Sequence, residues 1–258
     1  LFCLLAKNFG LNTNGESFLR IAQSIPFSII RKESFELENL EALLFARAGL
    51  LTIEKEDRYF KDLHSRFLYL LHKYQLDEFV VKPVQFFKHR PDNFPTIRLS
   101  QLANLYHSQQ NLFSIISTSN SVKSISKLMR VSSIQSIYDI FKILVSTYWQ
   151  NHYQFDKESP KKKKALTKSF INLLVINTII PMQFAYAKSQ GKEISEDLIQ
   201  LMQQVEAEKN SIVEKFNNFG IQSRNALDSQ SLLQLKNEYC NKSRCLECAI
   251  GIRLLKNS

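Results

Sequence analysis

Residues 89–106 read HRPDNFPTIRLSQLANLY, and the rest of the chain is organised around this stretch. Pro91 and Pro95 stiffen its first half. The apolar residues that follow recur at helical spacing, which predicts a rigid elbow that enters a buried helix near Pro95. Arg90 lies just outside this entry, and Arg98 lies in or near the first turn, where the helix dipole disfavours a cation. Arg98 therefore needs a partner, which is either a carboxylate of the same protein in an internal clamp or a bound phosphate.

Helical periodicity continues over most of the 258 residues, and only six glycines and six prolines interrupt it. The sequence predicts an all-α protein, an irregular bundle of about ten helices with no significant sheet, forming one domain over residues 1–258. Asn14 is expected to cap a helix over 16–24. Further helices are expected over 36–49, 54–74, 122–129, 132–149, 195–204, 208–219, 229–239 and 246–256, an extended connector over 79–87, and a mobile basic linker over 153–165.

Residues 167–188 are expected to form one long helix, whose apolar part reads FINLLVINTIIPMQFAYA. Asn172, Asn177 and Gln183 lie within this part and would be costly in lipid. The pattern favours a core helix kinked at Pro181, with Asn177 in a buried hydrogen-bond network, over a membrane span.

The chain carries 34 Lys and Arg against 24 Asp and Glu, a net charge of +10. This excess favours a polyanionic or acidic partner. Four cysteines do not make a disulfide framework, and no signal peptide opens the chain, so a reducing, cytoplasmic setting is expected. The chain starts at Leu1, inside an apparent helix, which suggests the C-terminal part of a longer protein.

A run of four lysines follows Pro160, and phosphate groups of DNA or RNA are its predicted ligand. The alternative is a solvated linker that makes no contact. The predicted nucleic-acid contacts are Lys161, Lys162, Lys163, Lys164, Arg90 and Arg98.

Three cysteines near the C-terminus are spaced C-x4-C-x2-C: Cys240, Cys245 and Cys248. This spacing matches the first three ligands of plant-type ferredoxins and suits a structural zinc ion or an iron–sulfur cluster. No fourth cysteine follows, so Cys3 is the predicted fourth ligand, with the His107 and His152 side chains as alternatives. Plain reduced thiols that pack on a final helix are the other interpretation.

The sequence holds no GxSxG, HExxH, P-loop or GxGxxG motif, and its paired carboxylates lie on ordinary amphipathic faces. No catalytic constellation is therefore predicted, and whether the chain belongs to an enzyme stays open.

Five stretches together resemble an uncharacterised bacterial family, domain of unknown function 2851: LLAKNFGLNTNGESF, LENLEALLFARAGLL, HRPDNFPTIRLSQLANL, INTIIPMQFAYAK and YCNKSRCLECAIG. The resemblance implies a longer protein whose missing N-terminal half is similar to restriction-endonuclease-like nuclease domains. It implies no established activity and no catalytic residue.

Two functions are consistent with these features. The first is a nucleic-acid-associated accessory region of a longer nuclease-like protein. The second is a non-catalytic structural or protein-interaction domain with a cysteine-based metal or iron–sulfur staple.

Overall fold

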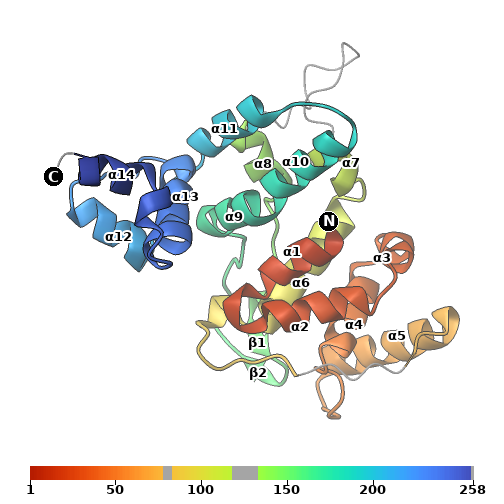
Figure 1. The fold of residues 1–258 in the computed structure, drawn as a ribbon. Helices are drawn as coiled ribbons and strands as arrows, with labels where there is room; N and C mark the ends of the chain where they lie inside the picture. The colour runs from red at the N-terminus through yellow and green to blue at the C-terminus, as the bar shows by residue number, and fades with distance from the viewer. Residues whose placement is uncertain (78–82, 118–132, 257–258) are drawn as a thin grey trace. The chain divides into compact units, whose positions relative to one another are not determined.

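The computed structural model describes residues 1–77, 83–117 and 133–256. The chain divides into two compact units, and its organisation as one domain over residues 1–258 stays a prediction. Unit 1 comprises Leu1–Val131 and Gln135–Tyr186, and unit 2 comprises Ser132–Ile134 and Ala187–Ser258. Helices dominate both units, and the only sheet among the described residues is a two-stranded hairpin (Figure 1). The predicted all-α class is confirmed.

Unit 1 carries most of the helices. They are α1 (Phe2–Phe9), α2 (Leu11–Gln23), α3 (Phe27–Glu33), α4 (Leu37–Arg47), α5 (Arg58–Tyr74), α6 (Pro95–Ser108), α7 (Leu112–Ser117), α8 (Ile134–Ile140), α9 (Lys168–Leu174) and α10 (Ile180–Ser189). The first residue of α8 and the last three residues of α10, from Ala187, are assigned to unit 2.

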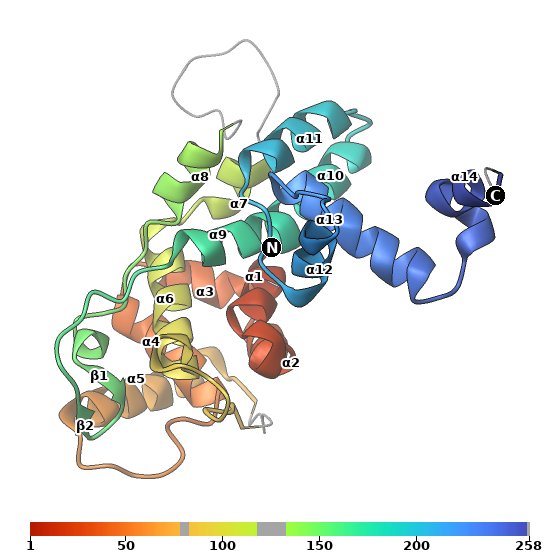
Figure 2. The ribbon, with the colours of Figure 1, turned by 90° about the vertical axis from the view of Figure 1, so that its left-hand side faces the viewer.

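Helix α6 is the central helix of unit 1, as the elbow pattern predicted. It begins at Pro95, where the missing N–H costs nothing in a first turn, and the 3-10 turn η1 (Pro91–Asn93) precedes it. Eleven of its fourteen residues are buried. It packs against α1 and α4 and contacts the hairpin strand β1 (Figure 2). A helix that is buried on nearly all sides belongs to the core. The elbow is attached directly to the first turn of this core helix.

The first two helices join differently from the prediction. Helix α2 begins at Leu11 with Gly10 as its N-cap, so the prediction of Asn14 as a cap is wrong. Gly10 is required because an added Cβ would lie 2.5 Å from the Asn14 carbonyl oxygen. The buried Asn14 side chain instead accepts from the Gln85 N–H and donates to the Gln85 carbonyl, both at 2.8 Å. Asn14 thereby fixes the chain that leads into the elbow.

The prediction of one helix over 132–149 is also wrong. Helix α8 ends at Ile140, and Leu144 then pairs with Ala165 in an isolated bridge. Trp149 is fully buried, with its ring stacked on Phe45 at 5.2 Å between centroids. Tertiary packing of this tryptophan outweighs local helical propensity. The helix predicted over 122–129 and the start of the 79–87 connector lie outside the described residues.

The expected linker contains the hairpin of β1 (His152–Gln154) and β2 (Lys157–Glu158), an antiparallel pair in which His152 lies opposite Glu158. A Phe155 side chain from the turn enters the aromatic cluster around Trp149, 5.1 Å between ring centroids. The segment therefore belongs to the folded part of unit 1.

Helices α9 and α10 are continuous through a π-helical segment (Val175–Ile179), as the prediction of one long helix required. The wide turn lies just before Pro181, which has no N–H to donate to an earlier carbonyl. Asn177 is exposed and donates to the Leu173 carbonyl, so its predicted place in a buried network is wrong. The buried polar side chains of this helix are Asn172, Thr178 and Gln183. Asn172 accepts from the Tyr138 hydroxyl at 2.7 Å, Thr178 accepts from the Asn8 amide at 2.8 Å, and Gln183 donates to the Ile116 carbonyl at 2.9 Å.

By length and apolar composition, Lys168–Ser189 is the one helix in the described ranges that would suffice to cross a membrane. However, 56% of its most apolar window is buried inside the protein. Core helices pass the same test, so this finding is weak evidence for a span.

Unit 2 contains α11 (Ser195–Gln204), α12 (Ser211–Asn218), α13 (Ala226–Gln234) and α14 (Ala249–Lys256). Asn210 and Asn225 cap α12 and α13 through their side-chain oxygens. A π-helical segment (Leu235–Cys240) and a 3-10 turn (Cys245–Glu247) connect α13 to α14. Helix α14 has no buried residue.

Candidate nucleic-acid interface

The two basic segments singled out in the sequence meet in unit 1. The Lys162 ammonium lies 2.6 Å from the Asp92 carboxylate, so the lysine run contacts the elbow. Tyr153 donates to the other Asp92 oxygen at 2.9 Å, and its own carbonyl accepts from the Thr96 hydroxyl at 2.7 Å. Both segments are thus tied to the first turn of α6.

Backbone hydrogen bonds hold the lysine run in place on both sides. The Lys162 N–H donates to the Gln150 carbonyl at 2.9 Å, and the Leu166 N–H donates to the Ile143 carbonyl at 3.1 Å. These two hydrogen bonds attach both ends of the lysine run to the preceding segment of unit 1.

Lys164 differs from the other three lysines because its side chain points inward and is 3% exposed. Its ammonium donates to the carbonyls of Trp149 and His152, both at 2.6 Å, and lies 3.5 Å from the centroid of the Tyr153 ring. Burial lowers the pKa of Lys164 to about 8. Lys164 therefore anchors the run, and we remove it from the predicted phosphate contacts.

Arg98 is buried too, and it also leaves the predicted set. Its guanidinium donates to the side-chain oxygens of Gln101 at 2.9 Å and Asn93 at 2.6 Å, and it stacks over Phe170 at 3.7 Å. The partners are neutral amides, whereas the sequence predicted a carboxylate or a phosphate. Burial lowers the pKa of Arg98 to about 10, and the nearby Asp92 carboxylate opposes this shift.

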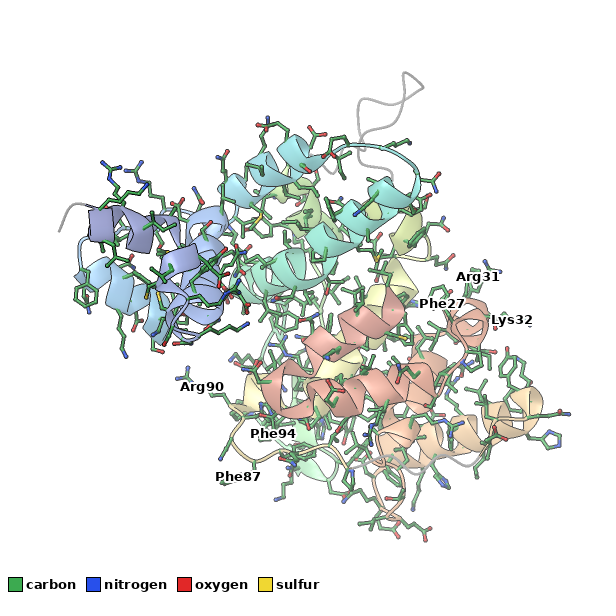
Figure 3. The ribbon with its side chains drawn as sticks, in the orientation of Figure 1. Phe27, Arg31, Lys32, Phe87, Arg90 and Phe94 are labelled. Carbon is green, nitrogen blue, oxygen red and sulfur yellow. The ribbon has the colours of Figure 1, made fainter. Side chains whose placement is uncertain are left out.

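Arg90 and the three outward lysines remain exposed, namely Lys161, Lys162 and Lys163. Arg90 lies two residues from Asp92, which places their Cα atoms within about 7 Å of each other. Figure 3 shows Arg90 on the elbow, with Phe87 and Phe94 along the same stretch of chain.

Sequence analysis missed two residues of this surface. The Phe87 ring is 76% exposed, and the exposed Lys88 ammonium lies 5.7 Å from its centroid. The signal was the FFKHR string, in which an aromatic pair precedes three basic or titratable residues. We call the exposed side chains Phe87, Lys88, Arg90, Lys161, Lys162 and Lys163 the basic elbow.

A small cavity of about 230 Å³ opens beside the lysine run. It is lined by Leu144, Gln150, Lys161, Lys163 and Lys164, and its walls are mostly carbon. Because long lysine side chains expose an ammonium at the end of an apolar stem, such a cavity offers an apolar floor with cations at its rim.

Asp92 is an acidic residue that contacts the basic elbow through Lys162. Partial burial would raise the pKa of its carboxyl, but the hydrogen bonds from Lys162 and Tyr153 outweigh burial and hold the pKa below its usual value. The carboxylate raises the pKa of Lys162 in return. Both groups stay charged at neutral pH, so Asp92 cancels about one of the lysine charges.

The predicted cysteine site is not assembled in the structure. Cys240 and Cys245 are exposed, Cys248 is buried, and all four cysteines are free. Within residues 1–77, 83–117 and 133–256, no three His, Cys, Asp or Glu side chains are grouped so as to hold a metal ion. Gly251 of α14 packs against the Cys245 carbonyl, where an added Cβ would clash. A zinc ion or iron–sulfur cluster on these thiols therefore stays a prediction.

The two histidines predicted as alternative ligands each have a ring nitrogen at hydrogen-bond distance from a backbone carbonyl. The His107 Nδ1 atom lies 2.8 Å from the Ser34 carbonyl, and the His152 Nδ1 atom lies 2.9 Å from the Tyr148 carbonyl. The His152 ring also stacks on Tyr148 at 3.9 Å. Both rings serve local packing in unit 1.

A family model described as "Protein of unknown function (DUF2851)" matches residues 1–211 of the 258-residue chain. The chain belongs to the DUF2851 family. Searches of curated proteins and of solved structures found no match. The DUF2851 match includes the basic elbow and Cys3, whereas Cys240, Cys245 and Cys248 lie beyond the matched residues. The DUF2851 description assigns no activity, so a function has to be argued from the surface itself.

Proposed function

We propose that the basic elbow binds the phosphate backbone of a nucleic acid, DNA or RNA. The contact between Lys162 and Asp92 carries this proposal, because it unites two basic segments that lie 70 residues apart in sequence. The two segments that this contact joins carry five exposed cations, namely Lys88, Arg90, Lys161, Lys162 and Lys163, and Asp92 partly compensates the charge of Lys162. Lysine and arginine side chains in such an array displace the counterions of a phosphate backbone, which favours binding at low salt.

The exposed Phe87 ring favours a single strand over a duplex in this proposal. An aromatic face next to cations can stack on any unpaired base, and every base has such a face. The cavity beside Lys161 and Lys163 adds an apolar floor of the same kind. Neither feature reads base edges, so binding is expected to depend little on sequence.

In this proposal the chain is a cytoplasmic accessory region of a longer protein. It would hold nucleic acid for the nuclease-like N-terminal half that the family resemblance implies. Its partners would be that half and the nucleic acid, with no membrane involved.

The test is an equilibrium binding measurement by fluorescence anisotropy with a labelled 20-nucleotide single strand. The variant replaces Lys161, Lys162 and Lys163 by glutamine and leaves Lys164 intact, because Lys164 anchors the backbone. We expect the variant to bind at least about tenfold more weakly at low salt. A matched control replaces the exposed unit 2 residues Lys188, Lys192 and Lys209 by glutamine and is expected to bind like the parent. Equal affinities for the parent and both variants would remove the proposal.

A second candidate function is a structural or protein-interaction role for the C-terminal segment. Helix α14 favours it, because the helix has no buried residue and exposes Ile250, Leu254 and Leu255. A zinc ion or iron–sulfur cluster on the three nearby thiols belongs to this candidate. It would tie the short terminal helix to the turn before it, which an isolated helix of this length needs in water.

A further inference from the structure

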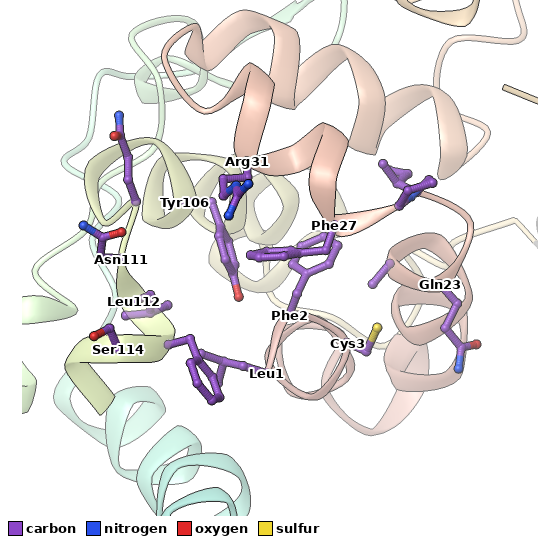
Figure 4. A pocket seen from close by; sticks show the side chains of 15 residues that line it. Leu1, Phe2, Cys3, Gln23, Phe27, Arg31, Tyr106, Asn111, Leu112 and Ser114 are labelled. Atoms are coloured by element: carbon purple, nitrogen blue, oxygen red, sulfur yellow. The ribbon is translucent and has the colours of Figure 1, made fainter. Parts of the chain in front are cut away.

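A second cavity in unit 1, of about 790 Å³, lies among α1, α3, α6 and α7 (Figure 4). Its volume falls in the range of sites that hold small organic molecules. Leu1, Phe2, Ile25, Phe27, Tyr106 and Leu112 supply apolar lining. The basic elbow contributes no residue to this cavity, so it is a separate feature of the surface.

Three aromatic rings pack together along one side of this cavity. The rings of Phe2 and Tyr106 meet edge to face at 5.0 Å between centroids, and those of Phe27 and Tyr106 meet at 5.9 Å. Phe27 is nevertheless 46% exposed, so one ring of the group is open to a ligand. Edge-to-face packing fixes the ring positions and leaves a preformed apolar wall.

Six of the fifteen lining residues have polar side chains, namely Gln23, Arg31, Tyr106, Gln110, Asn111 and Ser114. Arg31 is the one cationic side chain among these lining residues, and in the described part of the chain it has no ion-pair partner. Figure 4 shows Arg31 beside the rings of Tyr106 and Phe27. The Tyr106 side chain is 5% exposed, yet its hydroxyl finds no hydrogen-bond partner among the described residues. Leaving a buried hydroxyl unpaired is unfavourable, and a polar ligand atom that bonds to it would relieve that cost.

We propose that this cavity binds a small amphipathic organic anion. Its aromatic or aliphatic body would lie against Phe2, Phe27 and Leu112, and its carboxylate or sulfonate would pair with Arg31. One cation beside an apolar wall matches one anionic group on an apolar body. A nucleic-acid backbone, in contrast, needs several cations in a row, so this proposal and that for the basic elbow fail independently.

The test uses two probes that share one aromatic body. 8-Anilinonaphthalene-1-sulfonate carries an anionic group, and N-phenyl-1-naphthylamine is its neutral counterpart. Both are titrated by fluorescence into the folded protein and into the Arg31→Gln variant. We expect Arg31→Gln to weaken sulfonate binding about tenfold and to leave the neutral probe within twofold of the parent. Equal weakening of both probes, or no change in sulfonate binding, would overturn the assignment of Arg31.

A cavity-filling variant tests where the probes bind. Ser114 is exposed and lines the cavity, so Ser114→Trp is expected to reduce the affinity of both probes at least tenfold. Ser65→Trp changes an exposed residue of α5 that does not line the cavity, and it should bind both probes like the parent.

Cysteine alkylation gives the same information without a mutation. Cys3 lines the cavity, whereas Cys240 and Cys245 are exposed thiols of unit 2. The bound sulfonate is expected to slow iodoacetamide labelling of Cys3, read by mass spectrometry, and to leave the other two rates unchanged. Equal rates at Cys3 with and without the probe, together with unchanged binding to Ser114→Trp, would place the probe elsewhere and overturn the proposal.

Discussion

The Lys162 ammonium lies 2.6 Å from the Asp92 carboxylate, and this contact brings the lysine run against the elbow of the buried helix α6. The two residues are 70 positions apart. Their side chains are about half exposed, so the ion pair itself adds little to stability. The ion pair matters instead for the arrangement of the chain, because it places the lysine run beside the elbow that carries Arg90.

Replacing Asp92 by asparagine is expected to strengthen nucleic-acid binding. The change removes the carboxylate that offsets one lysine, and an amide oxygen can still accept from Tyr153. We expect the affinity for a single strand to rise about two- to fivefold at low salt, with a change in the free energy of unfolding under about 1 kcal/mol. Anisotropy and urea titration measure the two quantities.

Glu238→Gln is the matched control for Asp92→Asn. Glu238 forms an exposed ion pair with Lys242 in unit 2, so its removal changes net charge by the same amount at a different surface. The control should leave affinity unchanged. If it raises affinity as much as Asp92→Asn does, overall charge rather than the basic elbow governs binding.

Lys164 and Lys163 are adjacent in sequence but differ in role. Lys164→Met leaves the carbonyls of Trp149 and His152 without their donor, so we expect it to lower the free energy of unfolding by about 1–3 kcal/mol. Lys163→Met changes an exposed side chain and should stay within about 0.5 kcal/mol of the parent. Urea denaturation compares them. Equal effects of the two substitutions would show that the ammonium of Lys164 is not an anchor.

Glu41 gives the protein a pH-dependent stability. Its carboxyl is fully buried, with the hydroxyls of Tyr59 and Ser146 donating to one oxygen and no partner for the other among the described residues. Burial raises the pKa of Glu41 above its ordinary value of 4.5. The folded state then keeps a proton that the unfolded chain releases, so stability falls as pH rises above 4.5, until the folded pKa is reached.

Glu41→Gln removes this titration, and its stability relative to the parent should increase with pH in that window. The expected slope is about 1.4 kcal/mol per pH unit. Urea denaturation of both proteins from pH 4.5 to pH 8 measures the difference. A difference that stays constant with pH would show that Glu41 ionises normally in the folded state.

The cysteine proposal has a direct chemical test. Protein purified without oxygen is expected to contain zinc or iron, and a variant with serine at Cys240, Cys245 and Cys248 is expected to contain neither. Cys3→Ser separates the ligand sets, because only a site that uses Cys3 loses metal in that variant. Elemental analysis and the visible absorption spectrum provide the readout. Absence of both metals from the parent would end the proposal for this chain.

Local sequence patterns predicted helices well where apolar and polar residues recur with helical periodicity. Helix α11 occupies 195–204 as expected, and the entry of α6 at Pro95 follows from proline chemistry at a first helical turn. Prediction failed where distant packing decides. Trp149 and Phe155 enter a shared aromatic cluster, which replaces an expected helix and linker by a bridge, a 3-10 turn and a hairpin.

The candidate site was predictable only in its parts. The sequence identified the lysine run and Arg90 as basic segments, but spacing carries no information on a contact across 70 residues. It also gave no means to separate Lys164 from its neighbours, because the inward direction of one lysine depends on the carbonyls of Trp149 and His152. Arg98 was expected to pair with a charge and instead stacks on Phe170, which belongs to a helix far along the chain.

The salt dependence of single-strand binding tests the central claim, that the basic elbow contacts phosphates. The measurement is the slope of log Kobs against log salt for the parent and for the variant with glutamine at Lys161, Lys162 and Lys163. We predict a slope that is less steep in the variant by roughly 1.4 to 2.1, which is about 0.7 for each of two or three lost phosphate contacts. Parallel lines for the two proteins would contradict the account, because lysines that touch no phosphate release no counterions.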